Sequence, residues 1–396
     1  MPKLSARALS LQESAIRKLD AVAMARADVR FHRLNIGQPD LPTPAPMMEA
    51  IANFRPPLLA YGPSSGTPSC RAAAAAWHAQ SCPGLGPLDV AITTGGSEAL
   101  LFALLAVCDP GDEIIVPEPF YTNYNGFCTA AGVRVVPLRT ELADGFGPPS
   151  AAALDAVRTD RTRALLFSNP GNPTGAVWTA DQVGSVLEWA VQRDLFVIAD
   201  EVYRQIWFGQ PAPTALSFDF AKDHVLAVDS MSKTWAACGL RLGLLICRNR
   251  AVMERVERLG QARLGPQPLA QAAGEAAFAL PEHYYAELRA TWGARVDALH
   301  AGVAAIPGVR THKPMGAFYL MASLPVADTE AFARFLVERF EEDGESVMLA
   351  PGPGFFGDPA NGRDLVRLAA VYEPDRLRRA AALLGSALQA FAAAGG

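Results

Sequence analysis

Lys233 follows a short apolar segment and has small hydroxyl residues close to it, in the string Ser230-Met231-Ser232-Lys233. Partial burial at a strand end lowers the pKa of a lysine and frees its amine to attack a carbonyl group. Lys233 is therefore a candidate for an imine with an aldehyde cofactor. The alternative, which is the commoner fate of an isolated lysine, is a solvated surface residue.

An anion site is predicted by residues close to this lysine and by a second, distant segment. Arg241 lies in Gly239-Leu240-Arg241-Leu242-Gly243, where small neighbours let a guanidinium approach phosphate oxygens. Ser230 and Ser232 offer hydroxyl donors to the same anion. The glycines of Thr94-Gly95-Gly96-Ser97-Glu98 precede an expected helix, whose N-terminal N–H groups and dipole favour phosphate. The alternative for Arg241 is a surface ion pair.

Asp200 ends the apolar run 195–199, and Tyr203 stands three residues further on. A carboxylate at the end of a buried strand needs a partner, because an unpaired buried charge is costly. A protonated pyridine nitrogen is such a partner, and its positive charge makes the ring an electron sink. The Tyr203 hydroxyl could reach an oxygen of the same ring. The alternative for Asp200 is a helix N-cap.

Three further residues are candidates for contacts with cofactor or substrate. Asn172 lies in Asn169-Pro170-Gly171-Asn172-Pro173-Thr174-Gly175, a turn-rich loop in which its amide is expected to donate to the ring oxygen. Arg367, on a strand-like segment, could bind a substrate carboxylate through two hydrogen bonds. Gly37 could offer its backbone to that carboxylate. The alternatives are a plain strand-to-helix connection for the loop and a surface position for Arg367.

Short apolar runs alternate with helical patterns through the middle of the chain, which predicts an α/β layer with a mainly parallel seven-stranded sheet. The expected strands are Val90–Thr94, Glu113–Pro117, Val133–Pro137, Ala164–Ser168, Leu195–Asp200, His224–Asp229 and Leu242–Cys247. Ser97–Cys108 and Asp181–Arg193 are two of the helices expected between them.

The last quarter of the chain predicts a smaller α+β unit. Pro281–Ile306 is expected to form a long helix, followed by a strand at Ala317–Ala322 and helices near Thr329–Glu341 and Asp375–Phe391. Three regions are predicted: an N-terminal arm with part of the small domain (1–40), a large domain (41–285) and a C-terminal small domain (286–396).

The composition excludes several classes of protein. Of 396 residues half are hydrophobic, and the net charge of −5 supplies no basic field for nucleic acid or anionic lipid. The start of the chain has no signal-peptide pattern and no apolar run approaches a membrane span, so a cytoplasmic protein is expected. The six cysteines form no CxxC pair, so reduced, buried thiols are expected, with no metal site.

Taken together, these strings resemble the fold-type I enzymes that depend on pyridoxal 5′-phosphate (PLP), specifically the class I and II aminotransferases related to aspartate aminotransferase. The resemblance runs from about Leu34 to Val371. The matching strings are Ile36 to Asp40, Tyr61 to Gly66, Thr94 to Leu100, Asp109 to Asp112, Asn169 to Gly175, Asp200 to Tyr203, Ser230 to Lys233, Gly239 to Gly243 and Gly316 to Tyr319.

The resemblance implies a PLP Schiff base on Lys233, which would then serve as the base for the proton shift. Asp200 would pair with the pyridine nitrogen, and Asn172 and Tyr203 would bond the ring oxygen. Tyr121 would stack on the ring, and Arg367 would bind the substrate α-carboxylate. The implied phosphate ligands are Gly96, Ser97, Glu98, Ser230, Ser232, Arg241 and, from the neighbouring subunit of a homodimer, Tyr61.

The implied activity is transfer of an amino group between an L-amino acid and a 2-oxo acid. Some bacterial relatives carry a lysine where Ser97 stands, and that lysine helps to bind the distal carboxylate of the substrate, so a preference for aspartate does not follow. Two alternatives stay open at this point. One is a β-lyase or an ACC-synthase-like, cyclopropane-forming enzyme of the same fold. The other is a non-catalytic regulatory protein with an aminotransferase-like domain.

Overall fold

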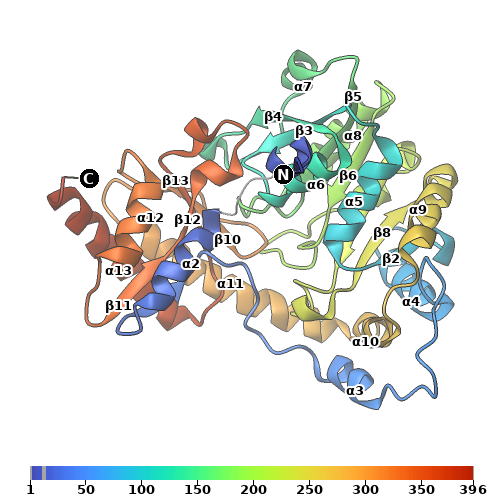
Figure 1. The fold of residues 1–396 in the computed structure, drawn as a ribbon, viewed down its shortest axis with the longest axis horizontal. Coiled ribbons are helices and arrows are strands. Elements are labelled where there is room, and N and C mark those ends of the chain that lie inside the picture. The colour runs from blue at the N-terminus through green and yellow to red at the C-terminus, as the bar shows by residue number, and fades with distance from the viewer. Residues whose placement is uncertain (1, 11–14, 396) are drawn as a thin grey trace.

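The computed structural model describes residues 2–10 and 15–395, and its largest sheet has seven strands in the order β2-β8-β7-β6-β5-β3-β4 (Figure 1). The strands are β2 (Val90–Thr93), β3 (Glu113–Glu118), β4 (Arg134–Arg139), β5 (Thr162–Ser168), β6 (Phe196–Asp200), β7 (Val225–Ser230) and β8 (Gly243–Cys247). Neighbouring strands are parallel except that β8 runs antiparallel to both β2 and β7. The mainly parallel sheet and its seven predicted strands are therefore confirmed.

Helices cover both faces of this sheet, which is why its inner strands are buried and mainly apolar, while the edge strand β4 begins and ends with arginine. Ile115 of β3 packs into the core on one face, while Ile114 and Val116 pack into the core on the other. The first core also contains residues of α4 (Pro68–Ala79), α8 (Ala180–Val191) and α10 (Pro268–Phe278). The second contains residues of α5 (Gly96–Val107), α6 (Asn123–Ala131) and α9 (Arg250–Arg263).

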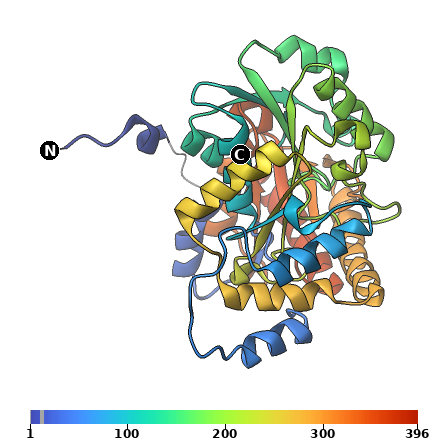
Figure 2. The same cartoon turned by 90° about the vertical axis from the view of Figure 1, so that its right-hand side faces the viewer.

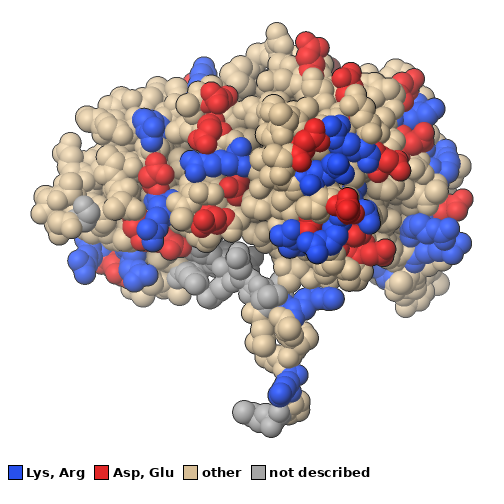
Figure 3. Space-filling view, turned by 90° about the horizontal axis from the view of Figure 1, so that it is seen from above, with Lys and Arg blue, Asp and Glu red and all other residues tan. Residues whose placement is uncertain are grey.

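The remaining elements complete the edges of this layer. In Figure 2, α3 (Ala45–Asn53) and α4 lie beside α10. The short helix α7 (Ala151–Val157) precedes β5, and α1 (Ala6–Ser10) contacts α6. Among the described residues, no helix is both long and apolar enough to span a bilayer. On the face shown in Figure 3, acidic and basic side chains lie among one another, and broad areas between them carry neither.

A separate core joins the C-terminal elements, and it is surrounded by a small antiparallel sheet, a parallel pair of strands and four helices. The strand order is β12-β13-β10-β9, and β1 pairs separately and in parallel with β11. The strands are β1 (Arg30–Arg33), β9 (Arg310–Thr311), β10 (Tyr319–Ser323), β11 (Glu345–Met348), β12 (Ala350–Pro351) and β13 (Leu365–Ala369). The helices are α2 (Ala15–Ala25), α11 (Glu282–Ala304), α12 (Thr329–Glu338) and α13 (Pro374–Ala393).

The predicted C-terminal helices are confirmed, but α12 ends three residues before the predicted end at Glu341. Arg339 leaves the helical conformation with φ of −130°, and the N–H of Phe340 bonds back to the carbonyl of Phe335. This turn buries Phe340 in the core. The domain boundaries at residues 40 and 285 stay predictions.

The register of the large sheet brings the ends of five strands to one edge. Ser168 of β5 lies opposite Asp200 of β6, and Ser230 of β7 lies opposite Gly243 of β8. Gly243 also lies opposite Thr93, the last residue of β2. Since loops at the carboxyl ends of parallel strands carry the ligand sites of open α/β sheets, chemistry is expected at this edge.

Candidate active site

A cleft of about 870 Å³ opens at this edge of the sheet, and it brings together most of the residues predicted from the sequence. The predicted residues that line it are Gly37, Gly96, Ser97, Tyr121, Asn172, Asp200, Tyr203, Ser230, Ser232, Lys233, Arg241 and Arg367. These residues come from positions 37 to 367 of the chain, so the tertiary fold and not sequence proximity assembles them.

Lys233 lies half-buried in this cleft, so the surface alternative for it is wrong. Its Nζ donates a hydrogen bond to the carbonyl oxygen of Gly37 at 2.7 Å and lies 5.7 Å from the ring centre of Tyr203. A Cβ atom on residue 37 would lie 1.9 Å from the hydroxyl oxygen of Tyr319, so glycine is required for this close approach of backbone. The amine is thereby held near the carboxyl ends of the parallel strands.

Asp200 is a buried carboxylate, and neither of its hydrogen-bond donors carries a positive charge. The Tyr124 hydroxyl donates to Oδ2 at 2.7 Å, and the N–H of Val202 donates to Oδ1 at 3.3 Å. Burial raises the pKa of Asp200 to about 6, although these donors and the charge of Lys233 lower it. The residues after it form a turn, so the helix N-cap alternative is wrong. A protonated ring nitrogen beside Asp200 would supply the missing charge.

Arg367 is also buried, which makes the surface alternative for it wrong. Its Nη1 donates to Oδ1 of Asn172 at 3.1 Å, and its Nη2 donates to the carbonyl oxygen of Asn35 at 2.7 Å. A guanidinium has five N–H donors, so these contacts fix its plane and leave donors for an anion. Because arginine only donates, Oδ1 of Asn172 must face it, and the Asn172 amide nitrogen points elsewhere.

The part of the cleft at the N-terminus of α5 has the form of a phosphate cradle. Gly95 has φ of +83°, and a Cβ there would lie 2.4 Å from Nη2 of Arg241. The guanidinium therefore packs directly against the backbone that leads into α5. Ser230 Oγ donates to Ser232 Oγ at 2.8 Å, which groups two hydroxyls beside this arginine. Arg241 donates to the carbonyl of Cys238, and the described residues give it no ion pair.

Aromatic side chains also line the cleft. The hydroxyls of Tyr203 and Tyr319 are hydrogen-bonded at 2.8 Å, and burial raises the pKa of Tyr203 well above its ordinary value of 10. Burial also raises the pKa of Tyr121 to about 12. The Asn123 amide donates to the Tyr121 hydroxyl at 2.7 Å. Tyr203 and Tyr121 are therefore expected to keep their protons at neutral pH.

Two predicted residues lie outside the cleft lining. The Glu98 carboxylate pairs with Arg263 and accepts the N–H of Thr94, while the Glu98 N–H bonds to the carbonyl of Gly95. Tyr61 has an exposed fraction of 86%. A role for either residue at the phosphate stays a prediction.

Four residues without a predicted role contribute to the cleft: Asn35, Tyr319 and Asp20 line it, and Tyr124 lies buried behind Asp200. Tyr124 donates to Asp200, Tyr319 bonds Tyr203, the Asn35 carbonyl orients Arg367, and Asp20 of α2 lines the wall. Tyr319 lies in a string that matched the resemblance, so its position was signalled although its contact was not. Nothing in the local sequence of Tyr124 or Asn35 distinguishes them from structural residues.

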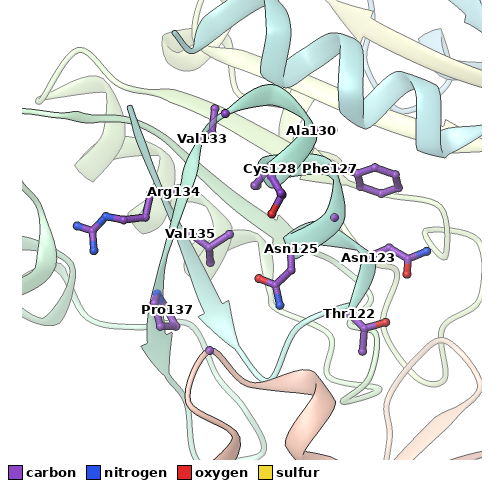
Figure 4. Close-up of a pocket in the computed structure, with 14 residues that line it drawn as sticks. Thr122, Asn123, Asn125, Phe127, Cys128, Ala130, Val133, Arg134, Val135 and Pro137 are labelled. Atoms are coloured by element: carbon purple, nitrogen blue, oxygen red, sulfur yellow. The ribbon is translucent and has the colours of Figure 1, made fainter. Parts of the chain in front are cut away.

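A second cavity, of about 760 Å³, lies between α6 and β4 (Figure 4). Of the described residues that line it, Arg134 alone is charged, and it forms an ion pair with Glu113. The cavity contains no predicted nucleophile, base or anion ligand, so we place the chemistry in the cleft that contains Lys233.

Comparisons with known proteins give the family. The model of the family "Aminotransferase class I and II" matches residues 30–342. The chain belongs to the class I and II aminotransferases. It is 31% identical to the aspartate aminotransferase of Streptomyces avermitilis over 89% of this chain and 90% of that protein. It is also 31% identical to the aspartate/prephenate aminotransferase of Thermus thermophilus, over 96% and 97% respectively.

Solved structures agree with the observed fold. The alanine aminotransferase of Pyrococcus furiosus superposes with a TM-score of 0.89 at 30% identity, covering 98% of this chain and all of that one. A mutant of the Thermus thermophilus aspartate aminotransferase gives 0.88 at 28% identity, with the same coverage. The predicted fold class and amino-group transfer are therefore confirmed. Because the names of these relatives differ in substrate, they do not specify the substrate of this aminotransferase.

Aminotransferases of this family use PLP, and the cleft fits that group. The fit rests on three features of this chain: a buried carboxylate that lacks a cation, an amine held nearby, and an arginine packed against the glycines before α5. PLP has a basic ring nitrogen, an aldehyde and a phosphate, which correspond to these features one by one.

Proposed function

We propose that this aminotransferase holds PLP as a Schiff base on Lys233 and transfers the amino group of an L-amino acid to a 2-oxo acid. The observation that carries the proposal is the joint placement of Lys233, Asp200, Arg241 and Arg367 around one cleft. Two arginines stand ready for two anions, a phosphate and a substrate carboxylate. The buried carboxylate of Asp200 and the amine of Lys233 line the same cleft as the two arginines.

Bound PLP supplies an electron sink that stabilises a carbanion at the substrate Cα. The chain supplies the groups that make use of it. Asp200 keeps the ring nitrogen charged, and the phosphate is held by Arg241, the serine hydroxyls and the N-terminus of α5. Tyr121 packs against the ring. The Lys233 amine would hold the cofactor aldehyde and would act as the base for the substrate Cα proton, accepting it and later returning it.

Arg367 orients the substrate for this proton transfer. A carboxylate bound by the guanidinium in a two-bond geometry fixes the rotation about the bond to Cα, so that the Cα–H bond faces Lys233. The contacts of Arg367 with Asn172 and Asn35 support this role, because they hold the guanidinium plane before substrate arrives. Asn172 links the substrate end of the cleft to the ring oxygen, to which its amide nitrogen is expected to donate.

Replacing Arg367 is expected to weaken substrate binding and catalysis while leaving the cofactor in place. In Arg367→Leu, kcat/KM for amino acid and oxo acid falls by about 10²- to 10³-fold, as expected when one partner of a buried charge-assisted contact is removed. Arg367→Lys keeps the charge but not the two-bond geometry, so it recovers only part of the loss. Steady-state kinetics with PLP titration check this. A loss of PLP affinity equal to the loss of kcat/KM would contradict the assignment.

Amino acids offered alone separate transamination from the lyase alternative. An aminotransferase converts one equivalent of amino donor per site to the oxo acid and stops, because the amino group stays on the cofactor. Addition of 2-oxoglutarate restores turnover. A β-lyase would release ammonia continuously without any oxo acid. We expect the stop, measured as oxo acid formed per site over a panel of neutral, acidic and aromatic donors, and the same panel gives the preferred substrate.

We further propose a homodimer in which Tyr61 of each subunit reaches the phosphate of the other. Its support is the exposure of Tyr61 together with that of Leu58 and Leu59, which are 73% and 75% exposed. An apolar surface segment of this kind is typical of a protein contact. Location in the cytoplasm is a separate proposal.

A further inference from the structure

A buried polar cluster lies directly behind the phosphate-binding serines and takes no part in the proposed mechanism. Its members are Asp229, the last residue but one of β7, His78 of α4, and the pair Arg204 and Glu201 in the turn after β6. The exposed fractions are 3%, 2%, 5% and 2% respectively. Burying four titratable side chains costs folding free energy, which pairing and hydrogen bonding offset only in part. The cluster is therefore expected to have a role.

The register of the sheet explains why Asp229 stands where it does. β6 ends with Asp200 opposite Val228, and the carbonyl of Val228 accepts the N–H of Glu201. Ser230, two residues further along β7, directs its N–H to the same side, beyond the end of β6. Asp229 Oδ1 accepts that N–H at 2.7 Å and so replaces the missing strand partner. Without it, a buried backbone donor at the start of the phosphate-binding string would be unpaired.

The consequences of this hydrogen bond extend to the hydroxyls in the cleft. Ser230 Oγ accepts the N–H of Ser232 at 3.1 Å and donates to the Ser232 hydroxyl at 2.8 Å. Ser232 is followed immediately by Lys233. The position of the Ser230 backbone therefore determines where both hydroxyls point.

The other carboxyl oxygen of Asp229, Oδ2, faces the buried imidazole of His78. Oδ2 lies 3.5 Å from Nε2 of His78, and the imidazole packs edge-on against Trp77 at 4.6 Å between ring centres. Arg204 lies over the same Trp77 ring at 5.1 Å and pairs with Glu201. Glu201 is itself held by the Thr214 hydroxyl and the N–H of Ala215. Among the described residues Nε2 of His78 has no hydrogen-bond partner, so the imidazole restrains Oδ2 by proximity and packing within this buried cluster.

We propose that Asp229 is a positioning residue for the cofactor phosphate, with His78 as its anchor. Asp229 touches neither substrate nor cofactor; it acts through the backbone of Ser230 and so aims the serine hydroxyls at the phosphate. The inference rests on the proposed function, because it assumes that PLP binds in this cleft. Burial raises the pKa of Asp229 to about 7 and lowers that of His78, so an uncharged side chain of the same shape can take the place of Asp229.

The test compares two ligands that differ only in the phosphate, PLP and pyridoxal, each titrated into cofactor-free enzyme. In Asp229→Ala we expect the Kd for PLP to rise at least about tenfold, as for a buried donor left unpaired, while that for pyridoxal changes less than about twofold. Asp229→Asn keeps an oxygen for the Ser230 N–H and an amide donor for His78, so its Kd for PLP stays within about threefold of wild type.

If Asp229→Ala does not fold, His78→Phe serves instead. It keeps the ring against Trp77 but removes the anchor of Oδ2, and we expect a PLP-selective loss of about three- to tenfold. Glu113→Gln is the matched control, because Glu113 is a buried, hydrogen-bonded carboxylate at the far end of the sheet. It should lower stability and leave the ratio of the two Kd values unchanged.

The outcomes are distinct. Equal losses for PLP and pyridoxal, or no loss in Asp229→Ala, overturn the positioning role. A wild-type enzyme that binds neither ligand at Lys233 overturns the proposed function itself.

Discussion

Lys233→Ala is expected to lose at least about 10⁴ in kcat, which is the upper range for removal of a general base, and to lose the covalent link to PLP. The reason is that, in the proposed function, one amine both holds the cofactor and moves the Cα proton. Of the described residues that line the cleft, no other is a lysine. Steady-state kinetics measure the loss.

Borohydride reduction followed by peptide mapping identifies the attachment site directly. In wild-type enzyme the pyridoxyl label should be found on the peptide that contains Lys233, and in Lys233→Ala it should be absent. Lys222→Ala is a suitable control, because Lys222 is close to Lys233 in the sequence but is exposed and lies outside the cleft. A label on any other lysine, or wild-type turnover in Lys233→Ala, would refute the central assignment.

Asp200→Asn is expected to make the cofactor-free protein more stable while lowering kcat by about 10²- to 10³-fold, the usual effect of removing a group that stabilises developing charge. An amide cannot hold the ring nitrogen in its charged form, so the electron sink is lost. In the cofactor-free protein the same carboxylate lowers the free energy of unfolding, because it is buried with no cation in hydrogen-bond contact.

The pH dependence of stability separates this explanation from a general effect of mutation. Burial raises the pKa of Asp200 from 3.8 to about 6, so the folded protein binds this proton more tightly than the unfolded chain. The stability that Asp200 contributes is therefore present below about pH 4 and is lost as pH rises to about 6. Two pKa units correspond to about 3 kcal/mol, which is the upper limit of the gain in Asp200→Asn above pH 6.

Thermal or urea unfolding of both cofactor-free proteins between pH 4 and pH 8 measures this difference. The pKa of Asp229 is also raised, by burial and in part by the charge of Asp200, so the same comparison is repeated in an Asp229→Asn background, where Asp229 no longer titrates. The two proteins should have similar free energies of unfolding near pH 4 and diverge up to pH 6. Parallel curves across the range would mean that Asp200 is already paired in the cofactor-free protein.

The sequence by itself determined the seven strands of the large sheet, five of the longer helices and the types of residue at the ends of the strands. Apolar runs on both faces specify a buried parallel strand, and the strings around Asp200 and Lys233 follow such strands directly. Local sequence is sufficient here, because burial periodicity and turn chemistry act over a few residues.

Only the tertiary structure decided how these groups are held. Arg367 could be read equally as a surface residue until its contact with Asn35, 332 positions away, showed that its plane is fixed. The bonds from Tyr124 to Asp200 and between Tyr203 and Tyr319 likewise join distant segments. His78 and Asp229 give no local sign of their contact. Hydrogen-bond partners of buried polar groups depend on which elements pack together, and that packing is a property of the whole chain.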